Sequence, residues 1–305
     1  MARGRVVVTG ASGFIGRCAL AALVRRGFEV HAVARERLPR AAPAEVDWHA
    51  VDLMDGRARR ALIDSLAAPY LLHLARYAEP GAFWAARDNA AWVAATVSLV
   101  DEFAAAGGRR ATLAGTCAEY DWAAPQPMAE DTAVAPATFY GVCKDATHRV
   151  AEGLAQRAAI ELAWGRVFFL YGPHEDERRL VPSVARALVA GERAPTSAGL
   201  QRRDFLHVDD AAHAFAAILD SDVRGAVNVA SGEAVTIRSI VEQLAQAADR
   251  PDLLDIGALP GRPGDPDEIS ADVTRLRDEV GFRPARSLHE GLVETVRWWR
   301  DQSRA

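Results

Sequence analysis

Three glycines at a spacing of three follow the first apolar run of the chain. Residues 5–9 are mostly valine, and Gly10, Gly13 and Gly16 come directly after them, before a segment with helical spacing. A strand, a glycine turn and a helix in this order let the backbone approach a pyrophosphate, and the helix N-terminus offers it unpaired N–H groups. The loop therefore predicts a dinucleotide-binding site made of Gly10, Ser12, Gly13, Phe14, Ile15 and Gly16.

Strand-like and helix-like segments alternate after this loop. We expect further strands at 29–34, 46–51, 70–75, 111–115 and 160–169. Between them, helical spacing predicts helices at 14–26, 57–67, 82–106 and 141–158. This alternation predicts an α/β fold with a Rossmann-like, doubly wound parallel sheet that is covered by helices on both faces.

The pattern changes after Tyr171-Gly-Pro173, where helices are separated by short strands and turn-rich segments such as 260–267. These helices are expected at about 178–190, 209–220, 236–248 and 288–300. We expect residues 1–170, with 203–230 returning to them, to form an NAD(P)-binding domain. Residues 171–305 would form a smaller C-terminal α+β substrate domain, and ligands would bind in the cleft between the two.

Composition and charge exclude several classes of protein. The chain is 50% hydrophobic and 25% charged with a net charge of −5, which is ordinary for a globular protein. It has no basic block for nucleic acid and no apolar run of the ~18 residues that a membrane span needs. The first apolar run is too short for a signal peptide, and Cys18, Cys117 and Cys143 form no CxxC motif. We therefore expect a cytoplasmic protein without a metal site.

Lysine is nearly absent from this arginine-rich chain. Lys144 is the only lysine among 36 basic residues, and it follows Tyr140 by four positions at the start of an expected helix. The two side chains then share one helix face, and an ammonium beside a phenol favours the phenolate. Such a pair can exchange a proton with a substrate oxygen during hydride transfer, and Thr116, after strand 111–115, can hydrogen-bond the same oxygen. We therefore predict Thr116, Tyr140 and Lys144 as the catalytic residues.

The end of the second strand distinguishes NAD from NADP. Ala34 stands where an NAD site has an acid for the ribose 2′-OH, and Arg35 follows it, placed to bind a 2′-phosphate. NADP(H) is therefore favoured over NAD(H). In the alternative interpretation, Arg35 and Arg37 are solvated loop charges and Glu36 binds the ribose.

Taken together, the motifs resemble those of the extended short-chain dehydrogenase/reductases, in the branch of nucleotide-sugar epimerases, dehydratases and reductases. The resemblance covers essentially the whole chain. It rests on Thr9–Gly16, Asp52-Leu53, His73-Leu-Ala75, Thr116 with Tyr120, Tyr140 with Lys144, Tyr171-Gly-Pro173, Arg203–Asp210 and Arg262–Asp265.

The resemblance implies a set of roles for these residues. Thr116, Tyr140 and Lys144 would be the catalytic triad, and the last two would also contact the cofactor. Further cofactor contacts would come from Asp52, Leu53, Leu74 and Ala75. The C-terminal domain would hold a nucleoside-diphosphate sugar. Many members dimerise through a helical bundle, which here would consist of residues 85–106 and 141–158.

Departures from the family pattern narrow the choice of reaction. The resemblance implies a Thr-Asp-Glu sequence at the end of the fifth strand in the 4,6-dehydratases. This chain instead has Cys117 and Ala118 after Thr116. Glu119 is shifted by one position, and alternation along extended backbone would point it away, so a dehydratase is disfavoured. The segment Gly115–Tyr120 instead resembles that of the 4-ketoreductases of 6-deoxyhexoses. We expect NADPH-dependent reduction of the 4-keto group of a nucleoside-diphosphate 4-keto-6-deoxyhexose.

The substrate-binding residues are expected to differ from those of epimerases. Phe169 falls where epimerases and dehydratases often have an asparagine that contacts the diphosphate, and a phenyl ring cannot donate that bond. The diphosphate would then be bound by Arg203 and Arg262, unless each forms a surface salt bridge, and Cys117 would line the substrate. Two alternatives remain, a sugar-nucleotide 4-epimerase with tightly bound NAD and a non-catalytic NADP-binding regulator, which would need a broken triad.

Overall fold

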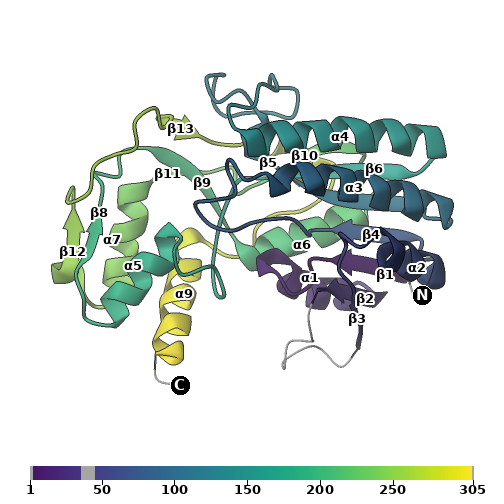
Figure 1. The fold of residues 1–305 in the computed structure, drawn as a ribbon. Coiled ribbons are helices and arrows are strands. Elements are labelled where there is room, and N and C mark those ends of the chain that lie inside the picture. The colour runs from purple at the N-terminus through teal and green to yellow at the C-terminus, as the bar shows by residue number, and fades with distance from the viewer. Residues whose placement is uncertain (1–2, 36–44, 304–305) are drawn as a thin grey trace.

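A seven-stranded parallel sheet forms the core of the larger part of the molecule, on the right in Figure 1. The computed structural model describes residues 3–35 and 45–303. The strands lie in the order β10-β6-β5-β4-β1-β2-β3. Their bounds are β1 (Gly4–Thr9), β2 (Phe28–Ala34), β3 (Val46–Ala50), β4 (Tyr70–His73), β5 (Arg110–Thr116), β6 (Glu161–Val167) and β10 (Gly225–Val229). The prediction of a doubly wound parallel sheet is confirmed, and the strand order reverses between β1 and β4, where such sheets bind ligands.

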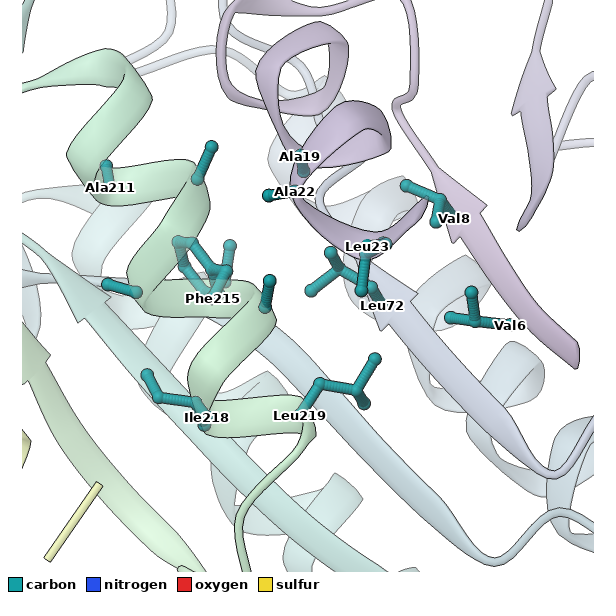
Figure 2. Close-up of a cluster of buried hydrophobic side chains, with 14 of the residues drawn as sticks. Val6, Val8, Ala19, Ala22, Leu23, Leu72, Ala211, Phe215, Ile218 and Leu219 are labelled. Atoms are coloured by element: carbon teal, nitrogen blue, oxygen red, sulfur yellow. The ribbon is translucent and has the colours of Figure 1, made fainter. Parts of the chain in front are cut away.

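Helices cover both faces of the sheet because successive strand residues point to opposite sides. Val6 and Val8 of β1 pack with α1 (Phe14–Arg25) and α6 (Val208–Leu219), and Phe215 of α6 lies at the centre of that cluster (Figure 2). Val7 points the other way, into a core made with α2 (Gly56–Leu66), α3 (Asp88–Ala105) and α4 (Phe139–Ala158).

The helix expected at 82–106 begins later, at Asp88. Residues 79–85 instead form turns, in which the Phe83 N–H donates to Glu79 O and Gly81 has a positive φ of 79°. The Asn89 side chain donates to Phe83 O at 2.6 Å and so holds these turns against the start of α3. The alanine-rich composition favoured a helix, but tertiary packing of Phe83 against Tyr140 decides the local structure.

A second, smaller assembly follows the large sheet. The single strand expected at 160–169 is divided at Phe168, because β7 (Phe169–Tyr171) leaves β6 and pairs with β9 (Arg202–His207). Strand β9 also pairs with β11 (Ala234–Thr236) and β13 (Glu268–Ile269), while β8 (Ala194–Thr196) pairs with β12 (Leu254–Ile256). The remaining helices are α5 (Leu180–Val189), α7 (Ile237–Ala247), α8 (Thr274–Asp278) and α9 (Leu288–Gln302).

Helices α5, α7 and α9 enclose a core of their own, to which Leu188, Leu244 and Leu292 contribute (Figure 1). The chain returns to the large sheet at β10, which pairs in parallel with β6. The division of the chain into two domains near residue 170 stays a prediction. None of the helices in residues 3–35 and 45–303 is long and apolar enough to cross a bilayer.

Candidate active site

The glycine loop is packed so closely that two of its positions have no room for a side chain. Gly10 has a positive φ of 68°, and a Cβ there would lie 2.6 Å from Ala75 N. A Cβ on Gly16 would lie 2.1 Å from Gly10 O. The loop therefore holds the end of β4 and the first turn of α1 together at the switch point of the sheet.

The N-terminus of α1 has features that suit a phosphate group. Gly13 is its N-cap and provides no side-chain acceptor, and the first turn contains no acidic residue. Amides of the first helical turn are left to a ligand in such an arrangement, and the helix dipole favours a negative charge there. Arg17, which the sequence analysis did not single out, donates to Ser12 O at 3.0 Å and adds a positive charge beside the loop. The residues present therefore fit a dinucleotide pyrophosphate.

The other predicted cofactor residues lie at the carboxyl ends of β2, β3 and β4. Arg35 is exposed directly after Ala34, while Glu36 and Arg37 lie outside the described residues. The Asp52 carboxylate accepts the Met54 N–H at 2.9 Å. Leu53 is buried in the core beneath α2, and Leu74 donates its N–H to Thr9 O. Contact of these residues with the cofactor stays a prediction.

His73 ties the glycine-loop strand to α3. Its Nδ1 lies 2.7 Å from Thr9 Oγ1, and its Nε2 lies 3.0 Å from Thr96 Oγ1. Burial, with a smaller effect of the Lys144 charge, lowers the pKa of His73 to about 3. The ring is therefore neutral near pH 7 and joins β1, β4 and α3 by hydrogen bonds.

Close packing at the start of α4 places Tyr140 at the end of β5. A Cβ on Gly141 would lie 2.2 Å from Ala118 O, so the helix rests directly on the short 3₁₀ turn Cys117–Glu119. The Thr138 hydroxyl caps the helix by accepting the Gly141 N–H. Thr116, the last residue of β5, accepts the Ala118 N–H with its hydroxyl at 3.2 Å. Tyr140 and Thr116 thus flank the same turn.

Lys144 lies one helical turn after Tyr140 and lines the same pocket. Its Nζ donates to Ala114 O at 2.6 Å and lies 5.6 Å from the centre of the Trp164 ring. Burial and the nearby Arg76 guanidinium lower the pKa of Lys144 to about 7. The pocket lies between α3, α4 and the residues after β4, and Ala75 is also in its wall. The structure therefore brings Tyr140, Lys144 and Ala75 together in the wall of one pocket, whereas Thr116 does not line this pocket.

Glu119 is fully buried and supports the turn below Tyr140. Its carboxylate accepts hydrogen bonds from Thr116 N–H at 2.8 Å and from Arg166 Nε at 2.8 Å. Trp164 Nε1 donates to it as well, at 3.0 Å. The expectation of extended backbone at this position is wrong, because residues 117–119 form a 3₁₀ turn that the Glu119 side chain caps. The carboxylate is used in these bonds and is not a free acid for elimination of water.

Three residues that sequence reasoning missed surround the Tyr140 ring. The Arg76 guanidinium carbon lies 3.8 Å from the ring centre. Phe83 and Trp84 pack edge-on against Tyr140, with ring centres 5.1 Å and 5.8 Å away. Because residues 82–106 were expected to form one helix, the contact of Phe83 and Trp84 with Tyr140 was not foreseen. Arg76 directly follows the strand-end sequence His-Leu-Ala, and this position was a usable signal for it.

The predicted substrate residues have different surroundings. Arg203 is buried and donates to Asp265 at 2.7 Å, and Asp265 N–H in turn donates to Arg262 O. Through these two hydrogen bonds, Asp265 joins the two residues predicted to bind the diphosphate. Arg262 itself is exposed. Cys117 is 6% exposed and packs with Phe168, and burial raises the pKa of its thiol to about 12. Substrate binding by Arg203, Arg262 and Cys117 stays a prediction.

Comparison with known proteins gives consistent matches. Residues 6–230 match the sequence model of the NAD dependent epimerase/dehydratase family. A dTDP-6-deoxy-L-talose 4-dehydrogenase (NAD(P)(+)) of Kitasatospora kifunensis is 30% identical over 316 residues, which cover 99% of this chain and 96% of that protein. A dTDP-glucose 4,6-dehydratase of Streptomyces niveus is 30% identical over 175 residues, and the match spans about half of its length (52%) and 56% of this chain. The solved structure of MoeE5 with UDP-glucuronic acid and NAD is 31% identical with a TM-score of 0.83, covering 98% of this chain and 100% of that one.

Proposed function

Because the chain belongs to the NAD dependent epimerase/dehydratase family, we propose that it reduces the 4-keto group of a nucleoside-diphosphate 4-keto-6-deoxyhexose with NADPH. The observation that carries the proposal is the shared pocket of Tyr140, Lys144 and Ala75 beside the glycine loop. At the coarser level, the chain is an enzyme of this family that acts on nucleotide sugars. The relative from Kitasatospora supports the finer assignment, since a 4-dehydrogenase acting in reverse is a 4-ketoreductase.

NADPH, when bound, supplies the hydride that adds to the carbonyl carbon. Tyr140 donates its phenolic proton to the carbonyl oxygen, so the C=O bond becomes a C–O–H group and Tyr140 is left as the phenolate. Lys144 supports that phenolate with its charge, and the Thr116 hydroxyl donates a hydrogen bond to the same oxygen. Solvent then returns the proton to Tyr140.

Three sequence positions favour reductase over epimerase. A reductase exchanges its cofactor in every turnover, and Ala34 followed by an exposed Arg35 suits the 2′-phosphate of NADPH. An epimerase retains NAD and returns the hydride, and it would be expected to have an acid at position 34. Phe169 also lacks the hydrogen-bond donor that epimerases and dehydratases often have there. A sugar-nucleotide 4-epimerase with tightly bound NAD remains the second candidate.

The proposal includes a homodimer formed through α3 and α4. These two helices lie side by side (Figure 1), and α4 exposes Val142 and Val150, each at 47%. The two valines are eight residues apart, which places them on one side of the helix. Burial of such a stripe against a second copy would remove apolar surface from water.

The decisive experiment is loss of NADPH absorbance with a panel of nucleoside-diphosphate 4-keto-6-deoxyhexoses, with NADH in parallel. Stoichiometric loss with one sugar is expected. Tyr140→Phe should lower the rate by ~10²–10⁴. Lys144→Arg is the matched test, because it retains a charge but not the compact ammonium that reaches Ala114 O, so a large loss is expected there too. No reduction of any sugar, with bound NAD and interconversion of sugar isomers, would establish the epimerase instead.

A further inference from the structure

Arg76 differs from the other inward-facing arginines in its lack of a counter-ion. Its Nε donates to Tyr77 O, while its Nη2 is buried without a hydrogen-bond partner. Among residues 3–35 and 45–303 it has no carboxylate within ion-pair distance. In contrast, every buried arginine of the same region has one, in the pairs Arg59–Glu102, Arg110–Glu161, Arg166–Glu119 and Arg203–Asp265. A cation without an acid partner in such a place needs another stabilising contact.

The contact that Arg76 makes is with the face of the Tyr140 ring. Its guanidinium carbon lies 3.8 Å from the ring centre, which is van der Waals contact. Phe83 and Trp84 close two edges of the same ring. Apolar rings keep water away from this contact, so the charge of Arg76 is screened less than it would be at the surface.

A guanidinium over a phenol ring discriminates between the two ionisation states of tyrosine. The neutral ring attracts a cation only through its quadrupole. The phenolate spreads part of its negative charge into the ring and attracts the same cation more strongly. An opposite charge within ~4–6 Å lowers the pKa of an acid by 1–3 units.

Several other charges face the same region, and their signs matter. Lys144 lies on the helix of Tyr140, and Glu119 lies in the turn on which that helix rests. The guanidinium carbon of Arg179 lies 5.2 Å from the centre of the Phe83 ring. Glu175 is close to Arg179, and burial raises the pKa of Glu175 to about 8. Burial and Arg179 lower the pKa of Arg76 to about 9, so Arg76 stays charged at pH 7. Burial and the Arg76 charge also lower the pKa of Lys144, which weakens the positive charge that the lysine offers to Tyr140. Glu119 is already bonded to Arg166, so it offers Tyr140 little opposing charge.

We propose that Arg76 is a positioning residue whose charge stabilises the phenolate form of Tyr140 and so makes Tyr140 a stronger proton donor to the substrate oxygen. The inference rests on the role of Tyr140 in the proposed function. From the four-residue spacing of Tyr140 and Lys144, the lysine alone is expected to lower the pKa of Tyr140. In this inference, Arg76 contributes to that lowering as well.

The test is a spectroscopic pH titration of the Tyr140 phenol in the full-length protein without substrate or cofactor. The curve for Tyr140 is the phenolate absorbance of the protein minus that of its Tyr140→Phe variant. The same difference is then taken between Arg76→Met and the double variant Arg76→Met with Tyr140→Phe. The midpoint of the Tyr140 titration should be about 1–3 pH units higher in Arg76→Met than in the parent protein. Arg76→Lys should restore part of that shift, and Arg76→Gln repeats the test with a polar side chain should the methionine variant fold poorly.

Arg109→Met is the matched control. Arg109 lies 5.9 Å from the ring centre of Tyr70, so the variant removes the same charge from a tyrosine outside the pocket. It should leave the Tyr140 midpoint unchanged. An unchanged midpoint in both Arg76→Met and Arg76→Gln would overturn the inference. If the midpoint shifts but no 4-keto sugar is reduced, the proposed function fails alone; if reduction occurs without a shift, only the role of Arg76 fails.

Discussion

Gly141 of α4 packs directly against Ala118, and a Cβ added to Gly141 would lie 2.2 Å from the Ala118 carbonyl oxygen. We predict that Gly141→Ala moves the start of α4 away from the end of β5 and displaces Tyr140. The expected loss of stability is about 1–3 kcal/mol, as for overpacking elsewhere in proteins, with at least a tenfold loss of reductase activity. Chemical denaturation and steady-state kinetics measure the two effects.

Gly56→Ala is the control for this substitution. Gly56 also lies in the first turn of a helix, but its Cβ would meet only the end of the Arg59 side chain, at an ordinary 3.5 Å. Alanine there should be neutral or stabilising by up to ~1 kcal/mol. Equal effects of the two substitutions would show that close contact with Ala118 does not position Tyr140.

Glu119→Gln tests whether this carboxylate supports the fold or takes part in the reaction. The variant leaves the buried Arg166 guanidinium without its acid partner, which should lower the free energy of unfolding by about 3–5 kcal/mol. Activity per folded molecule should fall less than tenfold at a temperature where the variant is folded. A loss of ~10² or more in the folded variant would mean that Glu119 acts in proton transfer.

The pKa of His73 predicts a pH-dependent contribution to stability. The pKa is about 3 in the folded protein and ~6.5 in the unfolded chain, so the unfolded state binds more protons between these values. The contribution of His73 is therefore fully present above pH ~6.5 and is lost as the pH falls towards 3. The difference in unfolding free energy between the parent and His73→Gln should shrink on acidification by at most about 1.4 kcal/mol per pH unit. A constant difference from pH ~7 to ~4 would contradict the neutral, buried state of His73.

Arg35 should control the choice of cofactor. Arg35→Ala should lower kcat/KM with NADPH about 10–100-fold, because one charge-assisted phosphate contact is lost, and it should leave the value with NADH nearly unchanged. Arg57→Ala, an exposed arginine of α2, is the control for loss of a surface charge. Equal losses with both cofactors in Arg35→Ala would refute the NADP preference.

The proposed dimer depends on the exposed valines of α4. Val142→Glu should convert a dimer into monomers, since it would place a charge in an apolar interface. Sedimentation equilibrium of the parent and the variant measures this. Leu259→Glu, at a residue 49% exposed outside α3 and α4, should leave the dimer intact. A monomeric parent protein at micromolar concentration would rule out the interface.

The sequence predicted those features that depend on neighbouring residues. Gly10 and Gly16 indicated the turn and its tight packing, because the backbone conformation and the contact between the two lie within one loop. The spacing of Tyr140 and Lys144 placed both in one pocket, because helix geometry alone determines which residues share a face. The alternation of strand and helix patterns along the chain was enough to predict the doubly wound sheet.

Only the tertiary structure decided the surroundings of Tyr140. Phe83 lies in turns rather than in a helix because its ring packs against Tyr140, and this contact outweighs local helix propensity. The buried bonds of Glu119 depend on Trp164 and Arg166 of β6, which no local pattern connects with residue 119. Arg76 reaches the Tyr140 ring because β4 and β5 are neighbours in the sheet and α4 follows β5. Such contacts join segments far apart in the chain, and their geometry follows from packing of the whole core rather than from any short stretch of residues.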